Sequence, residues 1–195
     1  MSEWFGKRTF AECHARATES WGPREALVHD GRRITFAELK TETDVVARWL
    51  ITLGIGLGDK VVLWMPNRPE WLYTFFALSK IGAVVVPVNT RFRANYLEYV
   101  VRQSDATTLI TADRSGLVDY LDLIRTVVPE IETNPRHALH SNDFPELKRI
   151  VILGSKVPDS AVSWSDMMAS GKAVSTGALA NRARQFAPDD TTLIM

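Results

Sequence analysis

Residues 69–88 read PEWLYTFFALSKIGAVVVPV, and this stretch decides the fold class. Its first part, from Pro69 to Ile81, is apolar on nearly every side of a helix, which predicts a helix that is buried on several sides. The run AVVVPV follows Gly82 without alternating polar residues, as expected for a strand that is covered on both faces. A buried helix that leads directly into a buried strand indicates a parallel sheet.

The same part of the chain does not predict a membrane span. From Trp71 to Thr90 only Lys80 is charged, and the length would suffice for a transmembrane helix. However, Lys80 lies at the centre, where a charge costs about 2.5–3.5 kcal/mol on insertion scales. Gly82 and Pro87 also interrupt the helical pattern. We therefore expect no transmembrane segment.

Helices and strands alternate on both sides of this stretch. An amphipathic pattern from Phe36 to Leu53 predicts a helix, and the apolar run KVVLWM after it predicts a strand. Further patterns predict helices near residues 94–103, 115–128 and 165–170, and strands at residues 107–111 and 149–153. The expected fold class is therefore α/β, with a mostly parallel sheet and helices on both of its faces. Residues 129–148 are polar and rich in proline, which predicts an exposed loop.

Local signals mark the ends of several elements. Thr9-x-x-Glu12 and Thr35-x-x-Glu38 have the spacing of capping boxes and predict two helix starts. Asp30-Gly31 lies between two strand-like runs and predicts a tight hairpin turn. In the second helix, the predicted inward face consists of Phe36, Leu39, Thr43, Val46, Leu50 and Leu53, and the opposite face carries Lys40, Asp44 and Arg48.

The composition excludes some classes of partner. The sequence has 23 Lys plus Arg and 23 Asp plus Glu, so no net field gathers nucleic acid or an anionic membrane surface. We therefore expect no nucleic-acid partner. The single cysteine, Cys13, cannot form an intramolecular disulfide, which fits a reducing cytoplasm. Because Cys13 shares helical spacing with Phe10 and Ala17, we expect it to be a small buried hydrophobe.

Two glycine-containing turns could bind phosphate. The GIGLG run from Gly54 to Gly58 follows a helix and precedes a strand, which is the reverse of the order that a dinucleotide loop requires. Gly154-Ser155-Lys156 does follow a strand, but it lacks the further glycines of a phosphate loop, and Pro158 argues against an immediate helix. The favoured interpretation is a helix-to-strand turn that needs flexible backbone for the first, and a surface turn for the second.

The histidines offer one candidate metal site. His137-x-x-His140 with Asp143 beyond could supply two imidazoles and a carboxylate. This set lies in a proline-rich polar loop without cysteines, so a solvated loop is favoured. His14 and His29 are isolated, and we expect them to be structural. No serine elbow, Cys-x-x-Cys or His-Glu-x-x-His motif is present, so the sequence predicts no catalytic, cofactor-binding or metal-binding residue.

Four stretches in the same order resemble the acyl-CoA synthetases and the wider adenylate-forming superfamily of AMP-dependent synthetases and ligases. ITFAEL at 34–39 is similar to the first core motif, with Phe36 in place of the commoner tyrosine. LSKIGAVVVPVNTRF at 78–92 is similar to the second core motif. WMPNRPEW at 64–71 and PDDTTLIM at 188–195 also match in place and character. The resemblance covers nearly the whole chain from Thr9 onward.

This resemblance implies what the parent protein does. The family joins a carboxylic acid to the α-phosphorus of ATP and then transfers the acyl group to a thiol, usually coenzyme A, and such enzymes serve fatty acid metabolism. The resemblance implies Mg and ATP as cofactors of the parent, an ATP-dependent, AMP-forming acid–thiol ligase. It assigns no catalytic position to this chain, and Pro87 and Asn89 are expected to shape the backbone.

The resemblance also bears on the last residues of the sequence. DDTTLIM has the pattern of a buried strand, and in the family this strand runs into a loop rich in Thr, Ser and Gly that holds the phosphates of ATP. We therefore expect residues 1–195 to be the N-terminal portion of an AMP-binding domain, truncated before the phosphate-binding loop. Such a portion would contain no cofactor of its own and would be inactive alone.

Two alternatives remain at this point. The chain could be a non-catalytic α/β module for interaction or oligomerisation, and an exposed sheet edge would favour a homo-oligomer. A small nucleotide-binding, flavodoxin-like protein is disfavoured because no turn from a strand to a helix carries a phosphate-binding signature. The expected location is cytoplasmic.

Overall fold

The computed structural model describes residues 6–171 and 175–195. The chain divides into two compact units. The first unit, which is mainly helical, comprises Met1–Gly58, Arg68–Ala83 and Gly171–Thr192. The second comprises Asp59–Asn67, Val84–Ser170 and Leu193–Met195 and contains a parallel sheet. Each unit is built from segments that are far apart in the sequence.

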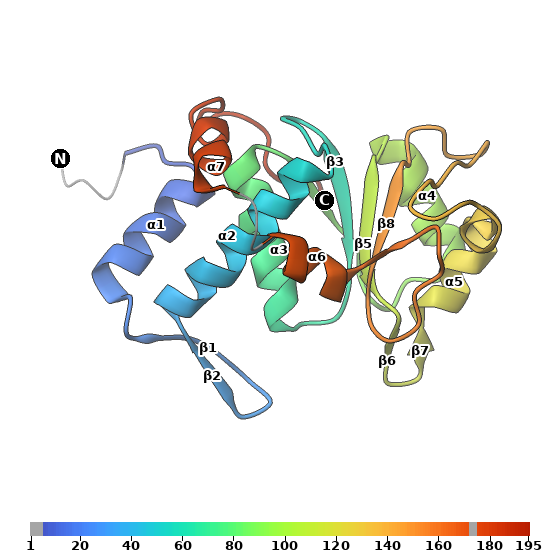
Figure 1. Cartoon of the computed structure of the whole chain (residues 1–195), viewed down its shortest axis with the longest axis horizontal. Helices are drawn as coiled ribbons and strands as arrows, with labels where there is room; N and C mark the ends of the chain where they lie inside the picture. The colour runs from blue at the N-terminus through green and yellow to red at the C-terminus, as the bar shows by residue number, and fades with distance from the viewer. Residues whose placement is uncertain (1–5, 172–174) are drawn as a thin grey trace. The chain divides into compact units, whose positions relative to one another are not determined.

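The first unit consists of helices and one hairpin. Its helices are α1 (Phe10–Trp21), α2 (Phe36–Thr52), α3 (Pro69–Ile81) and α7 (Thr176–Arg182). The antiparallel hairpin consists of β1 (Glu25–His29) and β2 (Arg32–Thr35). Figure 1 shows this hairpin in blue below α1 and α2, the helices that it connects along the chain. No helix in the described ranges is both long and apolar enough to cross a membrane.

The local signals for this unit are confirmed. In both predicted capping boxes, the Thr9 and Thr35 hydroxyls accept the backbone N–H three residues on, and Glu12 and Glu38 accept the N–H of the capping threonine. At the hairpin turn, Asp30 and Gly31 have φ angles of 49° and 76°. Two successive positive φ angles are the geometry that a two-residue hairpin requires, which is why an Asp-Gly pair predicts it.

The predicted burial of α1 is wrong. Cys13 is exposed, as is Phe10, whereas His14 is buried. The residues that we expected to face inward are Phe10, Cys13 and Ala17. They lie about one position along the helix from the face that packs inward. Burial on a helix depends on which neighbours approach it, and α1 contacts both α2 and α3.

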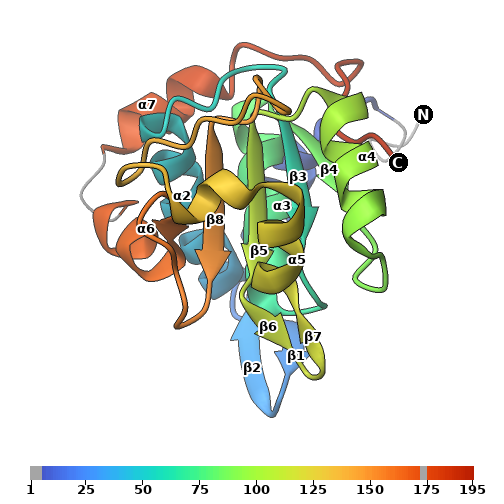
Figure 2. The ribbon, with the colours of Figure 1, turned by 90° about the vertical axis from the view of Figure 1, so that its right-hand side faces the viewer.

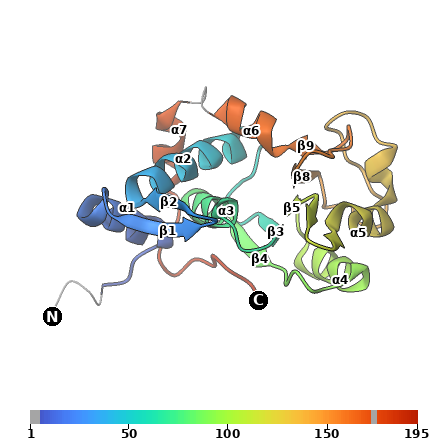
Figure 3. The same ribbon diagram turned by 90° about the horizontal axis from the view of Figure 1, so that it is seen from below.

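The second unit is organised around a five-stranded parallel sheet. Its strands are β3 (Lys60–Trp64), β4 (Val84–Pro87), β5 (Thr108–Ala112), β8 (Arg149–Leu153) and β9 (Val162–Ser163), and they lie in the order β4-β3-β5-β8-β9. All four strand pairs are parallel, which confirms the predicted α/β class with a mostly parallel sheet. Two helices of this unit, α4 (Ala94–Ser104) and α5 (Tyr120–Val127), lie on one face of the sheet, as Figures 2 and 3 show.

The central strands form the core of this unit. Every residue of β5 is buried, and Val61, Leu63 and Ile150 have no exposed surface. Continuous burial explains why these strands appear in the sequence as uninterrupted apolar runs. The buried hydroxyl of Thr111 donates to the Trp64 carbonyl at 2.7 Å, so this polar atom is also satisfied.

The structure corrects one predicted helix and confirms another. The helix predicted at 115–128 begins only at Tyr120, because a short hairpin of β6 (Arg114–Ser115) and β7 (Val118–Asp119) precedes it. Asp119 then caps α5 by accepting the Asp122 N–H at 3.0 Å. The helix predicted at 165–170 is α6 (Trp164–Gly171), and α7 was not predicted.

The connection between α5 and β8 has little regular structure. It begins with a 3₁₀ helix, η2 (Pro129–Glu132), and continues without a further helix or strand up to β8. Four apolar side chains along it, from Ile131, Leu139, Phe144 and Leu147, are nevertheless buried. These side chains attach the connection to the second unit.

The last residues differ from the expected buried strand. Leu193 forms a single parallel bridge with Val85, and the Ile194 N–H donates to the Val85 carbonyl at 3.0 Å. Ile194 and Met195 are 42% and 99% exposed. The segment therefore lies beside β4 in the expected direction, but it is neither buried nor a full strand.

Candidate functional site

The carboxyl ends of the parallel strands share one edge of the sheet, and this edge is the candidate functional site. β4, β3, β5 and β8 end at Pro87, Trp64, Ala112 and Leu153. In open α/β sheets, ligands bind outside the carboxyl ends of the strands, where the chain leaves the sheet in loops.

The loop after β4 is held by Asn89. The Trp64 indole Nε1–H donates to the Asn89 carbonyl at 3.2 Å, and the Arg91 N–H donates to Asn89 Oδ1 at 2.9 Å. The Trp64 ring also contacts the ring of Tyr120 edge to face, with 4.8 Å between the centroids. Both oxygens of Asn89 therefore shape the backbone of this loop.

The turn after β8 is closed by an internal carboxylate. Asp113, which follows β5, accepts the N–H groups of Ser155 and Lys156 at 2.9 and 3.3 Å. A Cβ atom on Gly154 would lie 1.9 Å from Asp113 Cγ, so only glycine allows this approach. The two N–H groups that a phosphate would need are thus already paired with an anion. This geometry is that of a turn.

The other glycine-containing turn, from Gly54 to Gly58, lies in the first unit. It joins α2 to β3, and the Gly58 N–H donates to the Gly82 carbonyl at 2.8 Å. No helix begins after these glycines, because β3 follows. The turn therefore lacks the helix N-terminus at which a dinucleotide phosphate binds.

The histidines of the loop from 129 to 148 are engaged through their backbones. The His137 N–H donates to the Asp159 carbonyl at 3.0 Å, and the His140 N–H donates to Asn134 Oδ1. Within residues 6–171 and 175–195, no group of three or more His, Cys, Asp or Glu side chains could hold a metal ion. The structure thus does not bring His137, His140 and Asp143 together as a metal centre.

A cavity of about 470 Å³ lies next to the loop after β4. Its lining combines two arginines, two aspartates and apolar side chains; the residues are Thr90, Arg91, Phe92, Arg93, Leu117, Val118, Asp119, Asp122 and Leu123. The volume is within the range of small-molecule sites. The guanidinium groups can bind an anionic group through paired N–H donors, and the apolar wall can cover an uncharged part of a ligand.

One of the two aspartates of this cavity, Asp119, makes contacts within the protein. The pKa of Asp119 lies below its usual range because its carboxylate accepts the Asp122 N–H and faces Arg114. The distance between Asp119 Oδ2 and Arg114 Nη2 is 3.3 Å.

The sequence did not predict this cavity. Arg91 and Arg93 flank Phe92 directly after a strand, which is a weak signal, and the opposing wall comes from residues 117–123.

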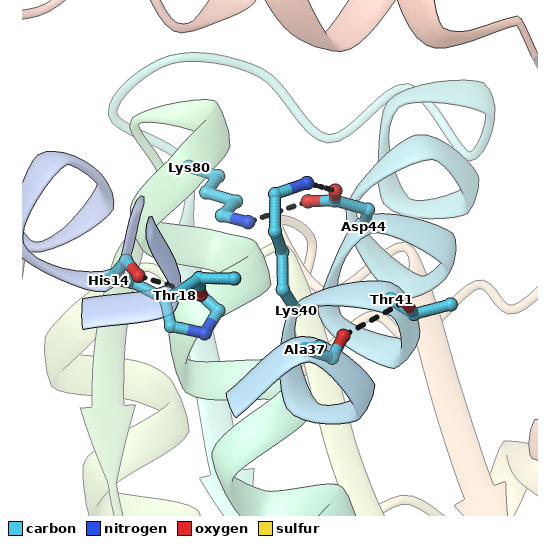
Figure 4. Close-up of polar contacts among 7 residues, drawn as sticks. All are labelled: His14, Thr18, Ala37, Lys40, Thr41, Asp44 and Lys80. Carbon is cyan, nitrogen blue, oxygen red and sulfur yellow. Dashed lines mark hydrogen bonds and ion pairs between the residues drawn. The ribbon is translucent and has the colours of Figure 1, made fainter. Parts of the chain in front are cut away.

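The Lys-x-Gly part of the second core motif lies in the first unit. Lys80 Nζ contacts Asp44 Oδ1 at 2.5 Å, and Lys40 Nζ contacts Asp44 Oδ2 at 2.5 Å, as Figure 4 shows. Burial alone would raise the pKa of Asp44, but the hydrogen bonds from Lys40 and Lys80 outweigh it and lower this pKa. Lys80 of α3 therefore contacts the charged face of α2 at Asp44, while the Lys40 side chain stays half-exposed.

Gly82 completes this motif as the left-handed C-cap of α3. Its φ angle is 71°, and a Cβ atom there would lie 2.3 Å from Leu57 Cδ1 and 2.9 Å from Phe186 Cδ1. A side chain at this position would be strained both by its backbone and by its neighbours. Lys80 and Gly82 thus join α3 to α2 and to the segments around residues 57 and 186.

Comparisons with known proteins agree on one family. The family model described as AMP-binding enzyme matches residues 14–195. YngI of Bacillus subtilis (strain 168), which carries the name of an acyl-CoA synthetase, is 33% identical over 90% of this chain and 32% of its own length. The mitochondrial medium-chain acyl-CoA ligase ACSF2 of Mus musculus is 30% identical over 84% of this chain and 27% of its own length. The chain thus spans about a third or less of these relatives.

Solved structures show the same fold. The anthranilate CoA ligase AuaEII, in complex with anthranoyl-AMP, has a TM-score of 0.71 and 24% identity over 87% of this chain and 29% of its own. The N-terminal subdomain of NpsA from Klebsiella oxytoca has a TM-score of 0.64 and 21% identity over 100% of this chain and 39% of its own. The described fold therefore corresponds to part of these proteins.

Proposed function

Because this chain belongs to the AMP-binding enzyme family, we propose that it is the N-terminal portion of an acyl-CoA synthetase-like ligase. The parent activates a carboxylic acid as an acyl adenylate and transfers the acyl group to coenzyme A. ATP and Mg are its cofactors, and fatty acid metabolism is its setting. This portion supplies the scaffold of the nucleotide site and no catalytic residue.

The observation that carries this proposal is the position of Leu193 beside Val85. The bridge between them is parallel, so the chain from Leu193 to Met195 runs in the same direction as β4. In the family that this chain resembles, the loop that holds the phosphates of ATP follows this strand. A continuation from Met195 would enter the carboxyl edge of the sheet, where open α/β sheets bind their ligands.

The chemistry of adenylate formation explains why residues 1–195 are expected to be inactive alone. Phosphoryl chemistry requires backbone N–H groups, a lysine or arginine, and Mg²⁺ to offset the charge that develops. At the edge of the sheet, Asp113 already accepts the N–H groups of Ser155 and Lys156. In the other unit, Lys80 is paired with Asp44. The remaining groups would come from the rest of the parent.

Two polypeptides test this proposal. Isothermal titration of residues 1–195 with Mg·ATP is expected to show no binding, and acid-dependent exchange of pyrophosphate into ATP is expected to be absent. A longer polypeptide that includes the downstream in-frame coding sequence is expected to bind Mg·ATP and to catalyse the exchange. Micromolar ATP affinity of residues 1–195 alone would contradict the proposal, as would a natural stop directly after codon 195.

A non-catalytic module for association is the second candidate, and the exposed edge beside β4 favours it. Ile194 and Met195 are largely exposed there, and such an edge tends to pair with another chain. Size-exclusion chromatography with light scattering separates the two cases. A stable, well-folded monomer or a discrete dimer favours an independent module, whereas aggregates favour a portion of a larger domain. We also propose a cytoplasmic location, supported by the single cysteine, Cys13.

A further inference from the structure

His14 occupies an unusual environment inside the first unit. It is 3% exposed, and its ring stacks on Phe76 of α3 with 4.4 Å between the centroids and 14° between the planes. Neither ring nitrogen has a hydrogen-bond partner among the described residues. The nearby Thr18 hydroxyl donates instead to the His14 carbonyl at 2.9 Å, as Figure 4 shows. Buried polar side chains are normally paired, so this imidazole is an exception.

The charges that face His14 come from the two helices packed against α1. Lys80 on α3 and Lys40 on α2 are cations, and Asp44 on α2 is, within the described part of the chain, the only carboxylate that acts on the ring. Both oxygens of Asp44 are already taken, one by each lysine. A protonated His14 would therefore be a third cation beside two others, and it would have to share the carboxylate with them.

The electrostatics agree with this geometry. Burial, together with the charges of Lys80 and Lys40, lowers the pKa of His14 to about 4, and Asp44 opposes this effect only in part. In a solvated α1 the pKa would have its ordinary value of about 6.5. Between these two values the released helix binds a proton more tightly than the packed helix does. Docking of α1 is therefore fully favoured above pH 6.5 and weakens as the pH falls toward 4.

We propose that His14 makes the packing of α1 on α2 and α3 sensitive to acid, so that protonation of its ring releases α1 while the rest of the chain stays folded. Release would separate the His14 ring from Phe76 and the Phe10 ring from Phe75, which now meet at centroid distances of 4.4 and 5.4 Å. An aromatic surface on α3 would then be exposed. This surface would make the first unit more prone to associate at acid pH than at neutral pH.

Hydrogen exchange measures this release directly. The 195-residue chain is followed by mass spectrometry between pH 7 and 4.5, with the intrinsic pH dependence of amide exchange removed. Peptides from α1 are expected to lose protection roughly 50-fold, the ratio that pKa values of about 4 and 6.5 imply over this interval, and to stay less protected than peptides from β5 throughout it. His14→Phe keeps an aromatic ring against Phe76 and is expected to remove this pH dependence.

Two further variants make the experiment decisive. His29→Phe is the matched control, because His29 lies in the β1–β2 hairpin beside Asp30, and it is expected to leave the pH dependence of α1 unchanged. Lys40→Met removes one cation and leaves an oxygen of Asp44 for the imidazole. The NMR titration midpoint of His14 is then expected to move upward, a readout that does not depend on whether His14→Phe folds.

Three results would overturn the proposal. One is a pH dependence of α1 protection that is the same in the original chain and in His14→Phe. Another is a free energy of opening for α1 that equals that of β5 at every pH, because α1 would then open only by global unfolding. The third is a His14 resonance that titrates near pH 6.5 while α1 stays protected, because the ring would then carry a proton without releasing the helix.

Discussion

The two units of the chain differ in the ionisable side chains that they bury. In the second unit the central strands are mostly apolar; the buried Thr111 hydroxyl there has a carbonyl partner, and the buried Thr108 hydroxyl has none among the described residues. In the first unit, Lys80 is only 7% exposed and depends on Asp44, and His14 has no hydrogen-bond partner among the described residues. The sheet unit is thus stabilised by transfer of apolar surface from water, whereas part of the helical unit depends on charge balance.

The largest expected effect tests the apolar side of this comparison. Ile110 in β5 has no exposed surface, so Ile110→Ala leaves a cavity in the sheet unit. The free energy of unfolding is expected to fall by about 4 kcal/mol. Urea denaturation followed by circular dichroism measures this change. A decrease below about 1 kcal/mol would mean that the sheet unit is not the main source of stability.

A somewhat smaller effect tests the charged side. Asp44→Ala leaves Lys80 buried without its carboxylate, and we expect the free energy of unfolding to fall by about 3 kcal/mol at pH 7. Lys40→Met is the control. Because Lys40 is half-exposed, this change should lower the free energy of unfolding by less than about 1 kcal/mol. The double variant Asp44→Leu with Lys80→Met is expected to recover much of the stability. If the single and double variants were equally unstable, packing rather than charge would be the cause.

The pH dependence of global stability comes next. The pKa of His14 is lowered to about 4, so the unfolded chain binds the extra proton first and stability decreases as the pH falls. Between pH 7 and 5 the free energy of unfolding of the original chain is expected to fall by about 2 kcal/mol more than that of His14→Phe. Parallel urea titrations at the two pH values give this difference. Identical decreases for both proteins would show that His14 does not contribute.

The helix caps should give the smallest effects, and these should be similar in the two units. Thr35→Ala removes the cap of α2, and Asp119→Ala removes the cap of α5. Each is expected to cost about 1 kcal/mol, because each leaves one backbone N–H of the first turn without its acceptor. Thermal unfolding compares both variants with the exposed control Thr41→Ala. If stability fell several times more in Asp119→Ala than in Thr35→Ala, the lost contact between Asp119 and Arg114 would also contribute.

Local signals in the sequence predicted the parts of the fold that depend on neighbouring residues. The two capping boxes and the Asp30-Gly31 turn are confirmed, because each is satisfied by atoms within a few residues. The start of α5 was missed because residues 114–119 form a short hairpin whose two strands pair with each other. The helix α7 was missed because its short sequence, TGALANR, carries no strong apolar period.

The candidate site was less predictable than the fold. The Gly154 turn could be located from the sequence, but its anion, Asp113, lies 42 residues before Ser155 and could not be inferred. The cavity beside β4 combines residues 90–93 with residues 117–123, and neither segment carries a motif for it. A site built from separate loops leaves little trace in a single sequence, because no spacing rule connects the loops.

The sequence by itself determined the alternation of helices and strands, the parallel sheet and the family, because these follow from the period of apolar residues and from short ordered motifs. Only the tertiary structure decided which faces are buried. It exposed Cys13, buried His14 and paired Asp44 with Lys80, since burial and charge pairing depend on elements that approach from elsewhere in the chain. The period of apolar residues predicts that a helix forms, but the elements that pack against the helix determine which of its faces is buried.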